Sequence, residues 1–100
     1  MIKIIALYRR PDDYQDFLRH YHEVHLPLVK RIPGLVRLEV AEVKRTLISE
    51  FPYVLMTEMC YPDAATFKAA MKSPEQAEVA ADLQGFAADL VTAIQVETIR

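Results

Sequence analysis

The feature that most constrains the fold is the order in which the spacing of apolar residues changes along the chain. Four short apolar segments are typical of strands, and two longer segments carry apolar residues every three or four positions, as helices do. The expected strands cover 2–9, 35–46, 53–61 and 92–99, and the expected helices cover 13–32 and 62–85. This order favours an α+β, ferredoxin-like βαββαβ fold, with a four-stranded antiparallel sheet and both helices on one face.

Proline, glycine and aspartate residues suggest where the first helix begins, bends and ends. Pro11-Asp12-Asp13 ends the preceding strand and supplies the N-cap oxygens, with Gln15 in the capping-box position three residues after Asp12. Pro27 lies inside the helical pattern, where it removes a backbone donor, so we expect a kink or a loosened turn around 23–27. Pro33-Gly34 then ends the helix, because this pair fits the centre of a type II turn.

Similar signals apply to the rest of the chain. The apolar pattern changes face within the second strand, which predicts either a bulge near 40–42 or burial on both faces. Ser73, followed by Pro74, restarts the second helical segment as an N-cap. Gly85 is the expected C-terminal cap of that helix.

Both faces of the first and third strands are apolar, although the two helices can cover only one face of the sheet. Ile5, Leu7, Val54 and Met56 are expected on one face. Ile4, Ala6, Tyr53 and Leu55, which alternate with them along the two strands, are expected on the other. Hydrophobic residues make up 52% of the chain, which is high for a small monomer. We therefore expect a homodimer in which two sheets pack face to face.

Composition excludes several classes of protein. At 100 residues the chain fits one domain, expected to span 1–100, and its net charge of −2 argues against a nucleic-acid partner or a polybasic membrane anchor. No apolar run is long enough to cross a bilayer, and the first residues lack the features of a signal peptide. A single cysteine, Cys60, suits a reducing compartment, so we expect a cytoplasmic protein.

The three histidines of the first helix are the main candidates for chemistry. At about 100° per residue, His25 falls in the apolar stripe, His22 at its edge, and His20 on the far side facing water. A buried histidine with a pKa near neutrality suits proton transfer. The alternative is a core histidine that is hydrogen-bonded to a carbonyl freed by Pro27.

Other kinds of site have weaker support in the sequence. His22 and His25 could share a metal ion, but no second pair of ligands accompanies them, so we expect no metal. Cys60 lies in an expected strand with no activating motif, which favours simple packing. Two glycines are too few for a glycine-rich phosphate loop, so we expect no nucleotide cofactor.

Carboxylates could orient His25, although the sequence does not say which one does. Glu39, Glu58 and Glu97 interrupt apolar strands and are most simply edge or interface charges. Asp82 is a polar residue within a small, apolar stretch of the second helix. It could equally be a solvated helix residue or part of a site.

Two segments of the chain resemble signatures of the EthD family, small dimeric α+β barrel proteins associated with ethyl tert-butyl ether degradation. The first is 17–28 followed by Ile32-Pro33-Gly34-Leu35, and the second comprises 73–75, 80–83 and Phe86-Ala87. The resemblance implies a barrel formed from the sheets of two subunits, with a pocket between sheet and helices. It also implies that His25 is a site residue and that Asp82 and Phe86 are pocket or structural residues.

The resemblance further implies the kind of function to expect. Similar dimeric barrels include a cofactor-free isomerase that uses a histidine of the equivalent helix, and cofactorless monooxygenases. The leading hypothesis is an enzyme of oxidoreductase or isomerase type without cofactors, acting on a small hydrophobic organic ligand. His25 would be its general acid or base, with Tyr21 and Tyr53 as hydrogen-bond donors. The alternatives are a non-catalytic binding protein that delivers such a ligand to a partner oxidase, and a purely structural dimer.

Overall fold

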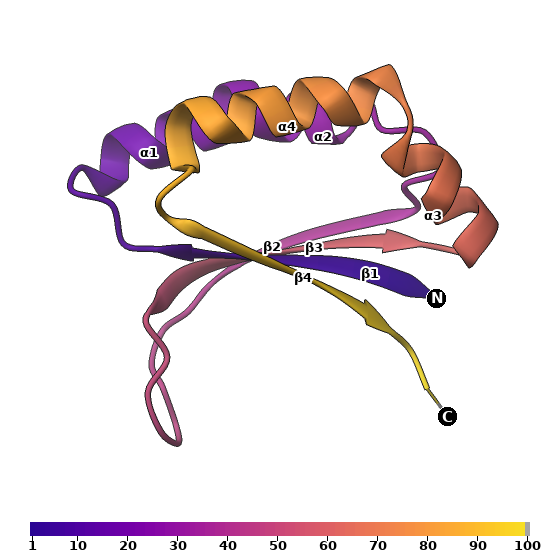
Figure 1. Ribbon diagram of the computed structural model, residues 1–100. Coiled ribbons are helices and arrows are strands. Elements are labelled where there is room, and N and C mark those ends of the chain that lie inside the picture. Colours follow the sequence, from indigo (N-terminus) through magenta and orange to yellow (C-terminus); the bar gives the residue numbers. More distant parts are fainter. Residues whose placement is uncertain (100) are drawn as a thin grey trace.

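The computed structural model describes residues 1–99 and has the expected ferredoxin-like α+β fold. Its strands are β1 (Ile2–Arg9), β2 (Arg37–Glu42), β3 (Tyr53–Tyr61) and β4 (Val91–Glu97). Its helices are α1 (Tyr14–His20), the π-helix η1 (Tyr21–His25), α2 (Leu26–Val29), α3 (Ala64–Met71) and α4 (Pro74–Ala87). The strands form one sheet in the order β2-β3-β1-β4, with every neighbouring pair antiparallel. All helices lie on the same face of this sheet (Figure 1).

The loosened turn expected near Pro27 is present as the π-helix η1. The backbone N–H of Leu26 donates to the carbonyl of Tyr21, five residues earlier, as a π turn requires. Pro27 follows in the first turn of α2, where a missing N–H costs little. The chain leaves the helical segment through Gly34, whose φ of 83° lies in the left-handed region that glycine favours.

The helix caps match the expected ones in part. Of the two aspartates expected to supply N-cap oxygens, Asp13 is the N-cap of α1, because its extended backbone lets its carboxylate accept from the Asp16 N–H. Gly85 is not a C-cap, since α4 continues through it to Ala87. Ser73 caps α4 as expected and accepts from the Gln76 N–H.

β2 has neither the bulge expected near 40–42 nor the alternative, burial on both faces. β2 pairs with β3 without interruption from Arg37 opposite Cys60 to Glu42 opposite Leu55. β2 is an edge strand with mostly exposed side chains, so burial does not enforce an alternation of faces there. A register shift occurs instead between β1 and β3, at Tyr8/Arg9, where Arg9 pairs with Tyr53.

The hydrophobic core lies between the helices and the sheet. Its largest fully buried side chains come from two strands and the first helical segment, namely Tyr8, Tyr21, Val29, Leu55 and Tyr61. Ala70 and Val79 contribute from α3 and α4. The aromatic rings of Tyr8, Phe17 and Tyr21 pack edge to face or stacked, at centroid distances of 5.5–6.0 Å.

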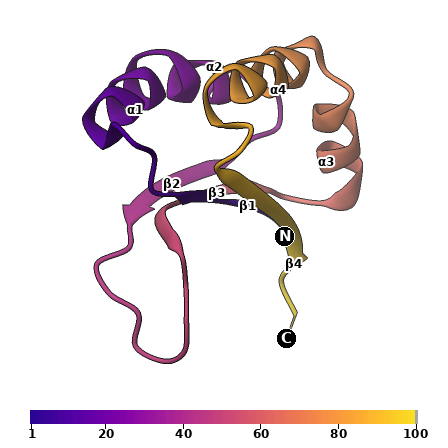
Figure 2. The same cartoon turned by 60° about the vertical axis from the view of Figure 1, so that its left-hand side comes forward.

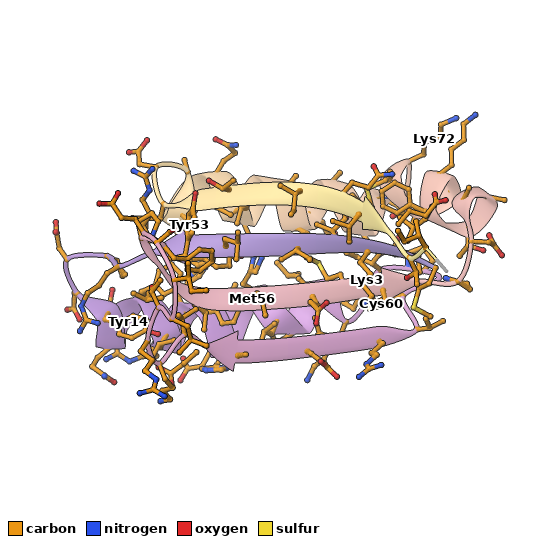
Figure 3. The ribbon with its side chains drawn as sticks, turned by 90° about the horizontal axis from the view of Figure 1, so that it is seen from below. Lys3, Tyr14, Tyr53, Met56, Cys60 and Lys72 are labelled. Atoms are coloured by element: carbon orange, nitrogen blue, oxygen red, sulfur yellow. The ribbon has the colours of Figure 1, made fainter. Side chains whose placement is uncertain are left out.

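The opposite face of the sheet carries no helix. Figure 3 views this face, on which Lys3, Met56 and Cys60 are labelled. Lys3 forms an ion pair with Glu58 at 3.5 Å, and the same face also carries apolar side chains, including Ile5, Leu7 and the 45% exposed Ile94. The loop between β2 and β3 extends beyond this face (Figure 2). Within residues 1–99, no helix is long and apolar enough to cross a membrane.

Candidate functional site

The π turn brings two histidines to the same side of the first helical segment. His20 ends α1 and His25 ends η1, five residues later. In an α-helix five residues turn through about 500°, which leaves the two side chains roughly 140° apart. In a π turn the backbone hydrogen bond joins residue i to residue i+5, which brings these two residues closer to the same side of the helix, so both imidazoles can face α4. The expectation that His20 faces water on the far side was therefore wrong.

Asp82 of α4 holds both imidazoles. Nε2 of His20 lies 2.9 Å from Oδ1 and 3.1 Å from Oδ2 of Asp82, and Nδ1 of His25 lies 2.9 Å from Oδ2. The exposed fractions of the side chains are 5% for His25, 16% for Asp82 and 36% for His20. The carboxylate that orients His25 is thus Asp82, and the cluster runs from a buried imidazole to a solvent-accessible one.

Burial and Asp82 act on His25 in opposite directions. Desolvation lowers the pKa of His25 below its ordinary value, and the hydrogen bond and charge of Asp82 partly offset that decrease. Neutral His25 is therefore the main form at pH 7. A neutral imidazole that donates from Nδ1 to a carboxylate carries its lone pair on Nε2, which is the arrangement of a general base.

Aromatic rings enclose the imidazoles. The ring centroid of Phe86 lies 4.5 Å from that of His20 and 5.0 Å from that of His25. The ring of Tyr21 stacks on His25 at 5.8 Å. These contacts make the surroundings of the cluster largely apolar, which strengthens its electrostatic interactions.

The ring of Tyr21 lines the histidine cluster, and its hydroxyl already forms a hydrogen bond to another residue. Tyr21 is fully buried, and its hydroxyl shares a hydrogen bond with Thr57, a buried residue of β3. Burial raises the pKa of Tyr21 to about 12, although the bond to Thr57 lowers it. Sequence reasoning missed Thr57, whose only signal is that it is a polar residue in an apolar strand.

Tyr53 lies on the other face of the sheet, away from His25. Its hydroxyl donates to Oγ1 of Thr92 at 3.0 Å, and its ring packs against Phe51. The register shift at Tyr8/Arg9 places Tyr53 opposite Arg9 on the helix-free face. The structure therefore brings Tyr21, His25, Asp82 and Phe86 together with His20, but leaves Tyr53 outside this group.

The described residues offer no evident place for a metal ion. Among residues 1–99, no three histidine, cysteine, aspartate or glutamate side chains are grouped so that they could hold one. Cys60 is a buried free thiol on β3 that pairs with Lys3 on the helix-free face of the sheet, whereas the imidazoles lie in the helical layer. The chemistry that these residues can perform by themselves is proton transfer at imidazole and carboxylate.

Comparison with known proteins identifies the family. The model of the EthD domain matches residues 9–90. The chain belongs to the EthD family. The crystal structure of an ethyl tert-butyl ether degradation (EthD) family protein from Bacillus halodurans C-125 is 36% identical, covers 99% of both chains and superposes with a TM-score of 0.91. An uncharacterized 11.0 kDa protein from the thcB-thcC intergenic region of Rhodococcus erythropolis is 28% identical over 92% of this chain and 89% of that protein.

More distant structures share the fold with this EthD-family chain. A dimeric ferredoxin-like protein of unknown function from Thermobifida fusca YX is 20% identical, covers 97% of this chain and 90% of its own, and gives a TM-score of 0.70. SnoaB, a cofactor-independent oxygenase from Streptomyces nogalater, is 16% identical, covers 99% and 92%, and gives a TM-score of 0.63. Both confirm the ferredoxin-like architecture.

Proposed function

We propose that this EthD-family protein is an enzyme that needs no cofactor and transfers a proton on a small, hydrophobic, oxygen-containing organic compound. The observation that carries the proposal is the buried pair formed by Nδ1 of His25 and Oδ2 of Asp82 at 2.9 Å. Nε2 of neutral His25 accepts a proton from the substrate, and the carboxylate of Asp82 stabilises the imidazolium that results. Return of this proton to another atom of the substrate completes an isomerisation. In an oxidoreductase reaction the same deprotonation forms a carbanion, and molecular oxygen, as the co-substrate, accepts its electrons.

The apolar surroundings of the pair support a hydrophobic substrate. Phe86 and Tyr21 present aromatic rings to the imidazoles, and few polar groups accompany them. A site with a few polar groups in an apolar enclosure is typical of small-molecule recognition. SnoaB, which shares the fold, is a cofactor-independent oxygenase, and this likeness supports chemistry without a cofactor.

The test measures exchange of substrate C–H protons for solvent deuterium in a panel of lactones and hydroxyaromatics. We expect at least one compound to exchange faster with the wild-type protein, and the His25→Gln and Asp82→Asn variants to lose most of that exchange. His22→Gln is the matched control, because His22 belongs to the same π turn but is exposed. Exchange that is undiminished in His25→Gln would refute the role of His25.

The protein acts as a homodimer in this proposal. The helix-free face of the sheet is largely apolar, and the Thermobifida protein, which shares the fold, is dimeric; both observations support a homodimer. Two such faces packed together form the barrel and remove apolar surface from water. We place the protein in the cytoplasm, where the free thiol of Cys60 stays reduced, with no nucleic-acid or membrane partner.

The burial of His25 favours one alternative, a non-catalytic protein that binds a hydrophobic compound and delivers it to a partner oxidase. His25 is only 4% exposed, so its imidazole could serve just to orient neighbouring groups. In that case His25→Gln weakens ligand binding, and no compound in the panel shows exchange.

A further inference from the structure

A groove crosses one end of the helical layer beside the histidine cluster. It consists of two adjoining depressions, of about 360 Å³ and about 440 Å³, which share Pro11, Gly85 and Phe86 in their walls. The smaller depression is also lined by Phe17 and His20, and the larger one extends to the end of α4. The groove therefore lies between the turn that joins β1 to α1 and the C-terminal part of α4.

The groove reaches the histidine cluster through Phe86. The rings of Phe17 and Phe86 lie 5.3 Å apart and form an aromatic surface. His25 does not line the groove, whereas Phe86 does and contacts the rings of both His20 and His25. His20 is thus the accessible imidazole of the cluster.

His20 has one ring nitrogen left for a ligand. Its Nε2 faces Asp82, where an imidazole N–H donates to the carboxylate. In an imidazole that carries its proton on Nε2, Nδ1 is an acceptor, which suits a hydroxyl donor. The groove is lined by four carboxylates (Asp12, Asp13, Asp16 and Asp89) and by one guanidinium, that of Arg10, so its charge disfavours an anionic ligand.

Gly85 keeps the groove open. It lies inside α4, where glycine is less favourable than alanine, and it has no positive φ that would require glycine. A Cβ at Gly85 would meet no atom within 4 Å, so packing does not require glycine either. The space beside Gly85 is the groove itself.

We propose that this groove binds a neutral, planar aromatic compound with a hydroxyl group, which stacks near Phe86 and donates its hydroxyl to Nδ1 of His20. Gly85 sets the width of the groove. This inference rests on the proposed function, since it names the ligand class and the entry route of the same site. It also assigns a ligand contact to His20 and a width-determining role to Gly85.

The test uses 1-naphthol as the probe and protein NMR as the readout. We expect 1-naphthol to shift the resonances of Gly85, Phe86 and the His20 ring, and 1-naphthoate to bind roughly tenfold more weakly because of the acidic lining. Gly85→Leu should abolish these shifts by filling the groove, and the smaller Gly85→Ala should weaken them. Ala77→Leu is the matched control, because Ala77 is an exposed residue of α4 that does not line the groove.

A second variant separates a ligand contact from a packing role. His20→Phe keeps a ring against Phe86 but removes the acceptor, so we expect roughly tenfold weaker binding of 1-naphthol and unchanged binding of naphthalene. Shifts confined to other parts of the protein, or full binding in Gly85→Leu, would overturn the groove even if His25-dependent exchange is observed. Binding in the groove without any exchange in the panel would instead support the groove and count against the proposed proton transfer.

Discussion

The substitution Asp82→Asn tests the histidine cluster directly. Asparagine keeps the size of the side chain but removes the charge that offsets the desolvation of His25. A hydrogen bond to a charged group contributes about 1.5–3 kcal/mol, and Asp82 is shielded enough (16% exposed) for solvent to screen little of that contribution. Loss of this contribution should therefore lower the pKa of His25 further below its ordinary value.

The same substitution changes the pH dependence of stability in a defined direction. The folded-state pKa of His25 is lowered, so its contribution to stability is present above the unfolded value of 6.5. That contribution is lost as the pH falls from 6.5 through the folded-state pKa. Because Asp82→Asn lowers this pKa further, the loss of stability in acid should continue to lower pH and reach a total that is about 1.5–3 kcal/mol larger.

Two measurements check this prediction. NMR titration of the imidazole resonances between pH 4 and pH 9 reports the pKa of His25, and the exposed His22 provides an internal reference. Urea unfolding at several pH values reports the stability. Asp89→Asn is the matched control, since it removes the same charge from an exposed position just beyond α4. A pKa of His25 that is unchanged or raised in Asp82→Asn would refute the assignment of Asp82 as its partner.

Four further predictions concern stability and assembly. Gly85→Ala should raise the free energy of unfolding by about 0.5–1 kcal/mol in urea titrations, because its Cβ meets open space in a helix. Gly34→Ala should lower that free energy by more than ~1 kcal/mol, because the φ of Gly34 is 83° and an added Cβ would clash with the side chain of Thr66. A thermal melt of this variant that matches wild type would exclude this strain. Tyr61→Phe should raise the free energy of unfolding in urea titrations by about 1 kcal/mol, because the buried Tyr61 hydroxyl has no hydrogen-bond partner within residues 1–99. Met56→Glu should weaken the proposed dimer by roughly 100-fold in sedimentation velocity, because it places a charge from each subunit in an apolar interface; an unchanged dimer would show that another surface mediates assembly.

The strands and the sheet could be predicted because their signals are local. β3 matches its predicted range, since Pro52 and Pro62 flank a continuous apolar and β-branched segment. β2 was predicted too long, because apolar residues continue past Glu42 into a segment that pairs only through Val43. An edge strand ends where its partner no longer offers hydrogen bonds, which composition alone does not show.

The placement of Tyr53 could not be predicted for a related reason. Alternation assigns Tyr53 to the same face as Leu55, which is fully buried under the helices. The register shift at Tyr8/Arg9 adds one residue to β3 between those positions, and a slip of one residue reverses the face of a side chain. Such a shift depends on the pairing of two strands that are distant in sequence.

The histidine cluster shows how one local irregularity determines the chemistry of the site. Regular α-helical spacing would place only one of His20 and His25 toward α4. Asp82 would then accept a hydrogen bond from a single imidazole, and solvent would bind its other oxygen. The π turn of η1 aligns both rings on one carboxylate, so that Asp82 accepts hydrogen bonds on both of its oxygens. The buried ring remains neutral because of its burial, while the accessible ring faces the groove. A single carboxylate thereby joins a buried imidazole in an apolar environment to an accessible imidazole beside the groove, within a chain of only 100 residues.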